Sequence, residues 1–347
     1  MELQKHNVEQ IVKEYHYVKA PLEKMLRLIE ILKHFSEENI FDHLCLKGGT
    51  AINLLYLPLP RLSVDIDLDI TDNVSGNELQ ELKKYLNNRI TEYMVSAGYS
   101  IHPASKTHYA LTSFVFNYET LWNSNDVLKI EISNMNRCHL YNTVEKEVCV
   151  PWNSEKITVK TLSAEELFAS KINALIDRGT ARDLYDIDSL SKSDLYHSID
   201  KERLHKAYLF YHSVGTKEPY YPINTENIDK ININKFKRET FSLLKNVTHF
   251  DINQMKQNVS EVIFPIISAN EREQEYLRLF ENGIYKPELL FDDPDVVNRI
   301  QNHPMAQWKM QNINKSKTLN EKLETAEGQQ KRKTTKINRK IKRDLER

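Results

Sequence analysis

Cysteine is scarce in this chain. The 347 residues include three cysteines, Cys45, Cys138 and Cys149, which lie far apart and form no C-x-x-C pair. An odd and widely spaced set argues against a disulfide scaffold and against a zinc site, and it is typical of a protein in a reducing cytosol. We therefore expect a cytoplasmic protein.

Long apolar runs are missing too. The first ten residues, MELQKHNVEQ, lack the apolar core of a secretion signal, and no stretch is long and apolar enough for a membrane-spanning helix, which needs about 20 residues. We expect no membrane partner. The formal net charge is only −1, so no field of the whole protein indicates a nucleic-acid partner.

Glycine and proline are few, at 8 and 11 residues, which favours helices over a turn-dense β fold. The length allows two domains, and an apolar content of 40% is enough to build sizeable cores.

Helical and strand-like patterns are interspersed up to about residue 160. Apolar residues in PLEKMLRLIEILKHF recur at spacings of three and four, so residues 8–40 are predicted to be helical. Alternation of apolar and polar residues predicts strands, and two amphipathic stretches predict helices. The predicted strands are 41–46, 63–70, 109–117, 126–133, 146–150 and 156–160, and the predicted helices lie at 50–57 and 76–98.

After Thr161 the pattern becomes almost wholly helical to about residue 310. We predict an α+β protein, with a mixed sheet and flanking helices followed by a mainly helical domain. Four segments are predicted: an N-terminal helical segment (1–40), the core (41–160), the helical domain (161–310), and a polar, basic and flexible tail (311–347).

Three aspartates occupy every second position of the predicted strand SVDIDLDI. Asp65, Asp67 and Asp69 share one face, while the apolar residues point to the other. Three like charges on one face repel one another, and a Mg²⁺ ion, which takes oxygen ligands, would offset that repulsion. A solvent-exposed polar face is the alternative reading.

The turn Gly48-Gly49-Thr50 lies between a predicted strand and a predicted helix. Backbone N–H groups there can hold a phosphate, although no G-K-[ST] follows as in a Walker A loop. Glu131, in LKIEIS, is the candidate for a third carboxylate beside the aspartates; the alternative is an isolated glutamate on an edge strand.

Two blocks of sequence resemble one family. GGTAINLLY…PRLSVDIDLD and SAEELFASKINALIDRGTARDLYDIDSL resemble the motifs of AbiEii-type toxins, nucleotidyltransferases of the DNA polymerase β-like superfamily whose relatives include the MenT toxins. The resemblance implies a nucleotidyltransferase fold for the core.

The resemblance also implies roles for particular residues. Those matching the nucleotide-binding turn and the rest of the first motif are Gly48, Gly49, Thr50, Arg61 and Ser63. Asp65 and Asp67 match the metal-binding pair, and Lys171 matches the essential lysine, which also neutralises the triphosphate. Asp183 matches the acidic residue of the last motif, and Asp186 is the alternative residue for that position. Glu131 is the third catalytic carboxylate and metal ligand in this interpretation.

The second block is also interpretable by itself. Ser163 and Glu166 have the spacing of a capping box, and Lys171 lies on the flank of the apolar stripe of helix 164–178. Arg182 and Asp186 have the i, i+4 spacing of an ordinary helical ion pair, which is the alternative to a catalytic role.

The expected activity is transfer of a nucleoside monophosphate from an NTP to an RNA acceptor, with two Mg²⁺ ions, or Mn²⁺, as cofactors. The resemblance implies the 3′ end of tRNA as acceptor, a block of translation, a cognate antitoxin and a role in phage defence. Residues 205–212, HKAYLFYH, and 331–347 could contact RNA, or they are an ordinary helix and a solvated tail. The alternatives are a protein or small-molecule acceptor, a metal-dependent nuclease, and a catalytically silent binding protein.

Overall fold

The computed structural model describes residues 3–152, 155–216, 221–245, 250–315 and 317. The predicted basic segment 331–347 lies outside these residues. Two helices, α1 (Lys5–Tyr15) and α2 (Lys19–Glu37), occupy most of the stretch predicted as one helical segment. They are separated because His16 adopts the left-handed conformation, with φ 59°, and ends α1.

An eight-stranded mixed sheet follows, in the order β3-β5-β6-β2-β1-β8-β7, with β4 paired to β5. β2 runs parallel to β6 and β1 parallel to β8, whereas β1–β2, β5–β6 and β7–β8 are antiparallel. This arrangement confirms the predicted mixed sheet. The strands are β1 (Leu44–Lys47), β2 (Asp65–Ile70), β3 (Ser100–Ile101), β4 (Lys106–Thr107), β5 (Leu111–Glu119), β6 (Asn125–Ser133), β7 (Val144–Glu147) and β8 (Thr158–Thr161).

The two faces of the central strands differ in polarity. Ile66 and Ile130 are register partners on β2 and β6, and both are fully buried on the apolar face. Helix α2 covers this face, since Arg27 stacks on Tyr118 of β5. Helix α4 (Gly76–Ser96) packs beside α2, since Tyr93 stacks on His34. The opposite face carries the acidic residues and is only partly covered.

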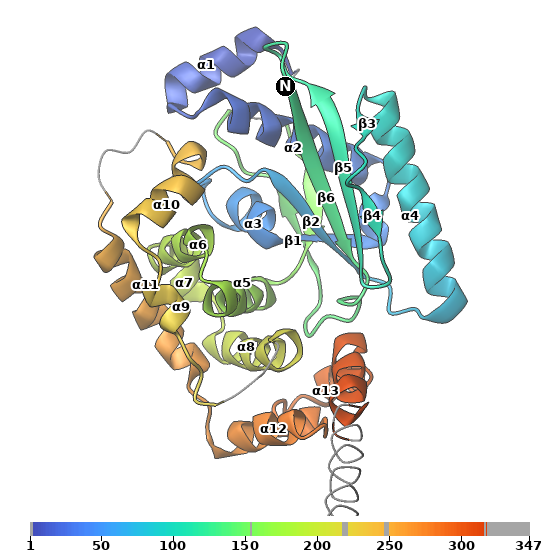
Figure 1. Ribbon diagram of the computed structural model, residues 1–347, viewed down its shortest axis with the longest axis vertical. Coiled ribbons are helices and arrows are strands. Elements are labelled where there is room, and N and C mark those ends of the chain that lie inside the picture. Colours follow the sequence, from blue (N-terminus) through green and yellow to red (C-terminus); the bar gives the residue numbers. More distant parts are fainter. Residues whose placement is uncertain (1–2, 153–154, 217–220, 246–249, 316, 318–347) are drawn as a thin grey trace, which may run out of the picture.

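The remainder of the described chain is helical, as predicted. Its elements are α5 (Ala164–Arg178), α6 (Ala181–Ser191), α7 (Asp194–Ser198), α8 (Lys201–Gly215), α9 (Glu226–Asp229), α10 (Ile233–Thr240), η3 (Phe241–Leu243), α11 (Ile252–Ile267), α12 (Glu271–Glu281), η4 (Pro287–Leu289) and α13 (Pro294–Ile300). Figure 1 shows α5, α6 and α8 grouped beside α3 and the sheet.

One continuous core includes buried residues from all three predicted segments before residue 310, so the segment boundaries stay predictions. Residues 304–315 are helical, and the described start of the predicted flexible tail therefore continues a helix. Across the described ranges, no helix combines the length and the apolarity that crossing a membrane requires.

Candidate active site

The glycine turn connects β1 to α3 (Gly48–Ala51), which continues as a π-helical turn, η2 (Ile52–Tyr56). Gly48 has φ +68°, and a Cβ atom there would lie 2.3 Å from Asp67 Oδ2. A Cβ atom on Gly49 would lie 2.6 Å from Arg61 Nη2. Both positions need glycine because the turn packs directly against the acidic strand and the loop before it.

Thr50 and Ser63 fasten this turn to the start of β2. The Thr50 hydroxyl lies 2.9 Å from Ser63 Oγ and also within hydrogen-bond distance of the Asp65 carbonyl oxygen. Both side chains are buried, at 1% and 6% exposure. Their hydroxyl groups therefore position Asp65 and do not face the solvent.

The three aspartates of β2 have different surroundings. The Asp65 side chain is 45% exposed, Asp67 is partly buried, and Asp69 is 2% exposed and pairs with Lys47 Nζ at 2.5 Å. Burial raises the pKa of Asp67, and the charges of Asp65 and Glu131 raise it further against the opposing effect of Lys47. Asp65 and Asp67 are therefore the acids whose charges are least compensated by bonded cations.

Glu131 lies on β6 as the register partner of Asp67, as its predicted role requires. Its carboxylate is held by Lys129 at 2.8 Å. Within the described ranges, no group of three or more Asp, Glu, His or Cys side chains is arranged to hold a metal ion. The predicted three-carboxylate set is thus not assembled here. The Asp65–Asp67 pair still provides the oxygen ligands that Mg²⁺ prefers, because Mg²⁺ is often bound by one or two carboxylates together with substrate phosphates.

Lys171 of α5 lies between the two acids of α6. Its ammonium group is 2.9 Å from Asp183 Oδ1 and 3.0 Å from Asp186 Oδ2, and the side chain is 8% exposed. Burial alone would lower the pKa of Lys171, but Asp183 and Asp186 outweigh it and raise the pKa. Lys171 is therefore held in its charged form close to Asp67, whose pKa its charge lowers.

Asp186 forms a buried bidentate ion pair with Arg61, whose Nε and Nη2 each donate at 2.7 Å. The alternative, in which Asp186 pairs with Arg182 along the helix, is wrong. The Arg182 guanidinium instead points to Asp65, with Nη1 at 3.9 Å from Oδ2. Arg61 is 3% exposed and joins the loop before β2 to α6. Its buried guanidinium therefore fixes Asp186 and the helix that carries it.

Asp183 is 1% exposed and, unlike Asp186, pairs with a cation whose side chain reaches the solvent. Arg178 Nε donates to Asp183 Oδ2 at 2.9 Å, and the Thr180 hydroxyl donates to the same oxygen at 2.6 Å. Burial would raise the pKa of Asp183, but Lys171 and Arg178 together hold it well below its usual range. The Arg178 side chain itself is 60% exposed.

The predicted capping box at the start of α5 is only half formed. Ser163 accepts a hydrogen bond from the Glu166 backbone N–H, as expected. The Glu166 side chain does not return to Ser163, because it accepts hydrogen bonds from the backbone N–H groups of Leu140 and Tyr141 and from the Tyr211 hydroxyl. Glu166 is fully buried and fastens the loop after β6 to α5 and α8.

Residues 205–212 do not offer an RNA-binding surface, contrary to that reading of their pattern. They lie within α8, where Tyr208, Phe210, Tyr211 and His212 are all at most 7% exposed. The interleaved aromatic residues are core residues, because α8 is covered on several sides by other helices.

Three cations of the site were not among the predicted residues: Lys47, Arg178 and Arg182. Lys47 directly precedes Gly48-Gly49, and the two arginines flank the Gly179-Thr180 break between α5 and α6. Their closeness in sequence to predicted site residues was the available signal.

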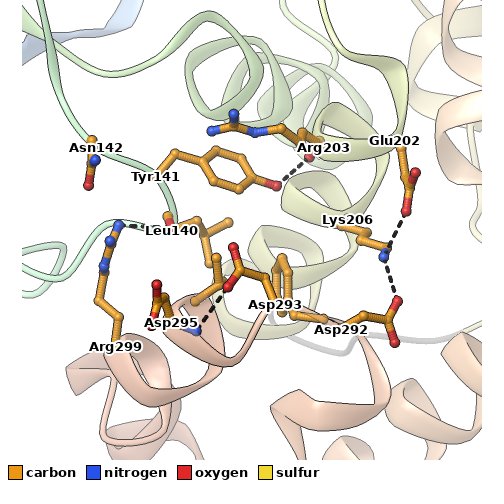
Figure 2. A pocket seen from close by; sticks show the side chains of 12 residues that line it. Leu140, Tyr141, Asn142, Glu202, Arg203, Lys206, Asp292, Asp293, Asp295 and Arg299 are labelled. Atoms are coloured by element: carbon orange, nitrogen blue, oxygen red, sulfur yellow. Dashed lines mark hydrogen bonds and ion pairs between the residues drawn. The ribbon is translucent and has the colours of Figure 1, made fainter.

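A pocket of about 530 Å³ lies elsewhere, between the loop after β6 and helices α8 and α13 (Figure 2). Lys206 pairs there with Glu202 and Asp292, and Arg203 stacks on the Tyr141 ring. None of the predicted site residues, all of which the structure describes, lines it.

Comparison with known proteins identifies the family and the fold. A family model described as "Nucleotidyl transferase AbiEii toxin, Type IV TA system" matches residues 30–262. The structure is similar to that of MenT4, a nucleotidyltransferase toxin from Mycobacterium tuberculosis H37Rv, with a TM-score of 0.61 at 15% identity over 81% of this chain and 98% of that chain. At this identity the likeness shows the fold. No curated protein compared with the chain matches it significantly.

Proposed function

The chain belongs to the AbiEii family of nucleotidyltransferase toxins, and we propose that it transfers a nucleoside monophosphate from an NTP to the 3′ hydroxyl of an RNA, with tRNA as the acceptor. Modification of the tRNA 3′ end would block translation. A cognate antitoxin and a role in phage defence belong to the same proposal, as does a cytoplasmic location.

One observation carries the proposal. The partly buried carboxylate of Asp67 lies against the turn at Gly48, which leaves no room for a side chain. The half-exposed Asp65 is two residues away on the same strand, and the charge of Lys171 acts on Asp67. Acids, a glycine turn and a fixed cation in one region are what transfer of a phosphoryl-linked group needs, because most of its catalysis is positioning and charge stabilisation.

The residues divide the work in the following way. Asp65 and Asp67 would hold Mg²⁺, which when bound lowers the pKa of the attacking hydroxyl and neutralises the leaving pyrophosphate. The turn at Gly48 and Gly49 presents backbone N–H groups to the phosphates. The acceptor oxygen forms a bond to the α-phosphorus as the bond to the β-phosphate oxygen breaks, and pyrophosphate leaves in line.

The cations complete the proposed site. Lys171, fixed by Asp183 and Asp186, stabilises the charge that develops on the phosphates, and Arg61 holds Asp186 in place. Arg182 has a 45% exposed side chain beside Asp65, which places it to contact the nucleotide phosphates. Glu131 stays a proposed third ligand, for which Lys129 would have to release it.

Incubation of the purified protein with α-labelled NTPs, Mg²⁺, total RNA and cell lysate tests the function. We expect label on tRNA with wild type, none with Asp67→Asn or Lys171→Met, and wild-type labelling with Asp42→Asn, a control at an exposed acid on η1 (Ile40–Asp42). Label on protein or on small molecules without labelled RNA would overturn the acceptor. No NTP-dependent labelling of any acceptor would overturn the activity.

A further inference from the structure

A second cavity has a composition that the proposed reaction leaves unexplained. It has a volume of about 380 Å³ and lies between the end of α1 and η3. Its aromatic and cationic lining comprises His16, Tyr17, Phe241, Lys245 and Phe250, and the rest of its lining is apolar. We call it the aromatic groove.

The aromatic groove contrasts with the other described pockets in its charge. The pocket of Figure 2 is lined by both signs of charge: four carboxylates, Glu202, Asp292, Asp293 and Asp295, and three cations, Arg203, Lys206 and Arg299. No carboxylate is among the described residues that line the aromatic groove, where Lys245 is a cation. A ligand that carries negative charge and flat apolar rings therefore meets no like charge in the described lining of the groove.

Phe241 presents a ring to solvent in this groove. Its side chain is 39% exposed, although it packs against Phe250 with ring centroids 5.4 Å apart. Lys245 is exposed, and its ammonium lies 5.7 Å from the Tyr15 and Tyr17 ring centres. Exposed aromatic faces beside flexible cations are the features with which proteins bind unpaired nucleotides, by stacking the base and neutralising the phosphate.

Hydrogen bonds attach the groove to the loop that leads into the active site. The Tyr17 hydroxyl donates to the Leu59 carbonyl, and the Leu62 N–H donates to the Leu243 carbonyl at 2.8 Å. Asp65 follows Leu62 by three residues, so these two residues lie at most about 11 Å apart along the chain. The loop before β2 therefore contacts the groove on one side and leads into the acidic strand on the other.

We infer that the aromatic groove binds an unpaired nucleotide of the RNA acceptor, upstream of the 3′ end that enters the active site. This inference rests on the proposed function and names the acceptor as a single-stranded RNA end. Stacking accepts any base, so the groove would not select a sequence.

Fluorescence anisotropy with a short, 5′-labelled single-stranded RNA and the full chain tests the inference. Phe241→Ala and Phe241→Leu should each raise the Kd for RNA about fivefold or more, the loss expected for one stacked base. The leucine variant keeps an apolar side chain, which protects the test against a simple folding defect. Phe264→Ala is the matched control, because Phe264 is 73% exposed on α11 and lies outside the groove.

The affinity for NTP, measured in the same variants, should stay at the wild-type value. Lys245→Gln should weaken RNA binding and reduce its salt dependence by about one ion. If wild type binds RNA and the Phe241 variants bind it as tightly as Phe264→Ala does, the groove inference is wrong and the proposed function stands. If wild type binds NTP but no RNA, both the inference and the RNA acceptor are wrong.

Discussion

Removal of one partner of the buried ion pair between Arg61 and Asp186 should strongly destabilise the protein. Arg61→Met leaves the Asp186 carboxylate, which is 0% exposed, with Lys171 at 3.0 Å as its remaining cation, and Lys171 also serves Asp183. Asp183 would keep Arg178 as a second cation, whereas Asp186 would depend on the shared ammonium group alone. Loss of one partner of a buried pair costs about 3–5 kcal/mol, a large share of the roughly 5–15 kcal/mol that stabilises a typical domain.

A double variant separates the charge from the packing. Arg61→Met with Asp186→Leu removes both charges and leaves Lys171 paired with Asp183, so the buried cluster is neutral again. We expect the double variant to be more stable than Arg61→Met, since replacement of a whole buried pair by apolar residues is often neutral. The control is Lys192→Met, which removes an ion pair to Asp188 from a side chain that is 59% exposed and should cost less than about 1 kcal/mol.

Urea unfolding followed by tryptophan fluorescence measures five proteins: wild type, Arg61→Met, Asp186→Leu, the double variant and Lys192→Met. The reasoning is refuted if Arg61→Met loses no more free energy of unfolding than Lys192→Met does. It is also refuted if the double variant loses as much free energy of unfolding as the sum of its two single variants, or more, because the two charges would then not stabilise one another.

Three further predictions concern the acids and the glycine turn. Asp67→Asn should raise the melting temperature at pH 7, because a carboxyl group with a raised pKa destabilises the fold when it is ionised, and this gain should vanish below about pH 4. Added Mg²⁺ should raise the melting temperature of wild type and not that of this variant. Equal stabilisation of both proteins by Mg²⁺ would exclude Asp67 as a ligand. Gly48→Ala should abolish nucleotide transfer because its Cβ atom would meet Asp67, whereas Gly76→Ala, also at positive φ but with open space around it, should leave transfer unchanged; two equally active variants would contradict the close packing. The lowered pKa values of Asp183 and Asp186 contribute stability that is complete above the unfolded-state pKa of about 3.9 and is lost as the pH falls through the folded-state pKa values. As the pH is lowered, the free energy of unfolding should therefore fall less steeply in Asp183→Asn than in wild type.

The sequence was sufficient for the elements that have a strong local pattern. The alternation in DIDLDI predicted β2 and its acidic face, and the change of pattern after Thr161 predicted the helical region. The motif positions in two blocks were sufficient to identify the family. These features depend on residues close together in the chain, whose periodicity is visible without a structure.

Long-range pairing could not be predicted in the same way. Arg182 and Asp186 have ideal helical spacing, yet each side chain takes its partner from the first block, Asp65 and Arg61 respectively. Glu166 has the spacing of a capping box, but its buried carboxylate satisfies backbone N–H groups of a distant loop. A buried charged side chain pairs with the group that the packing brings near it. An unpaired buried charge costs more free energy than an ion pair on a helix surface contributes.

The pairing of Arg61 with a residue 125 positions later also orders events during synthesis. A ribosome adds about 5–20 residues per second, so roughly 6–24 s separate the appearance of Asp67 from that of Asp186. Throughout this interval the growing polypeptide carries both proposed metal ligands but lacks the groups that fix Lys171 and Arg61. Under the proposed function, the growing polypeptide would thus be unable to modify tRNA until Asp186 has been made.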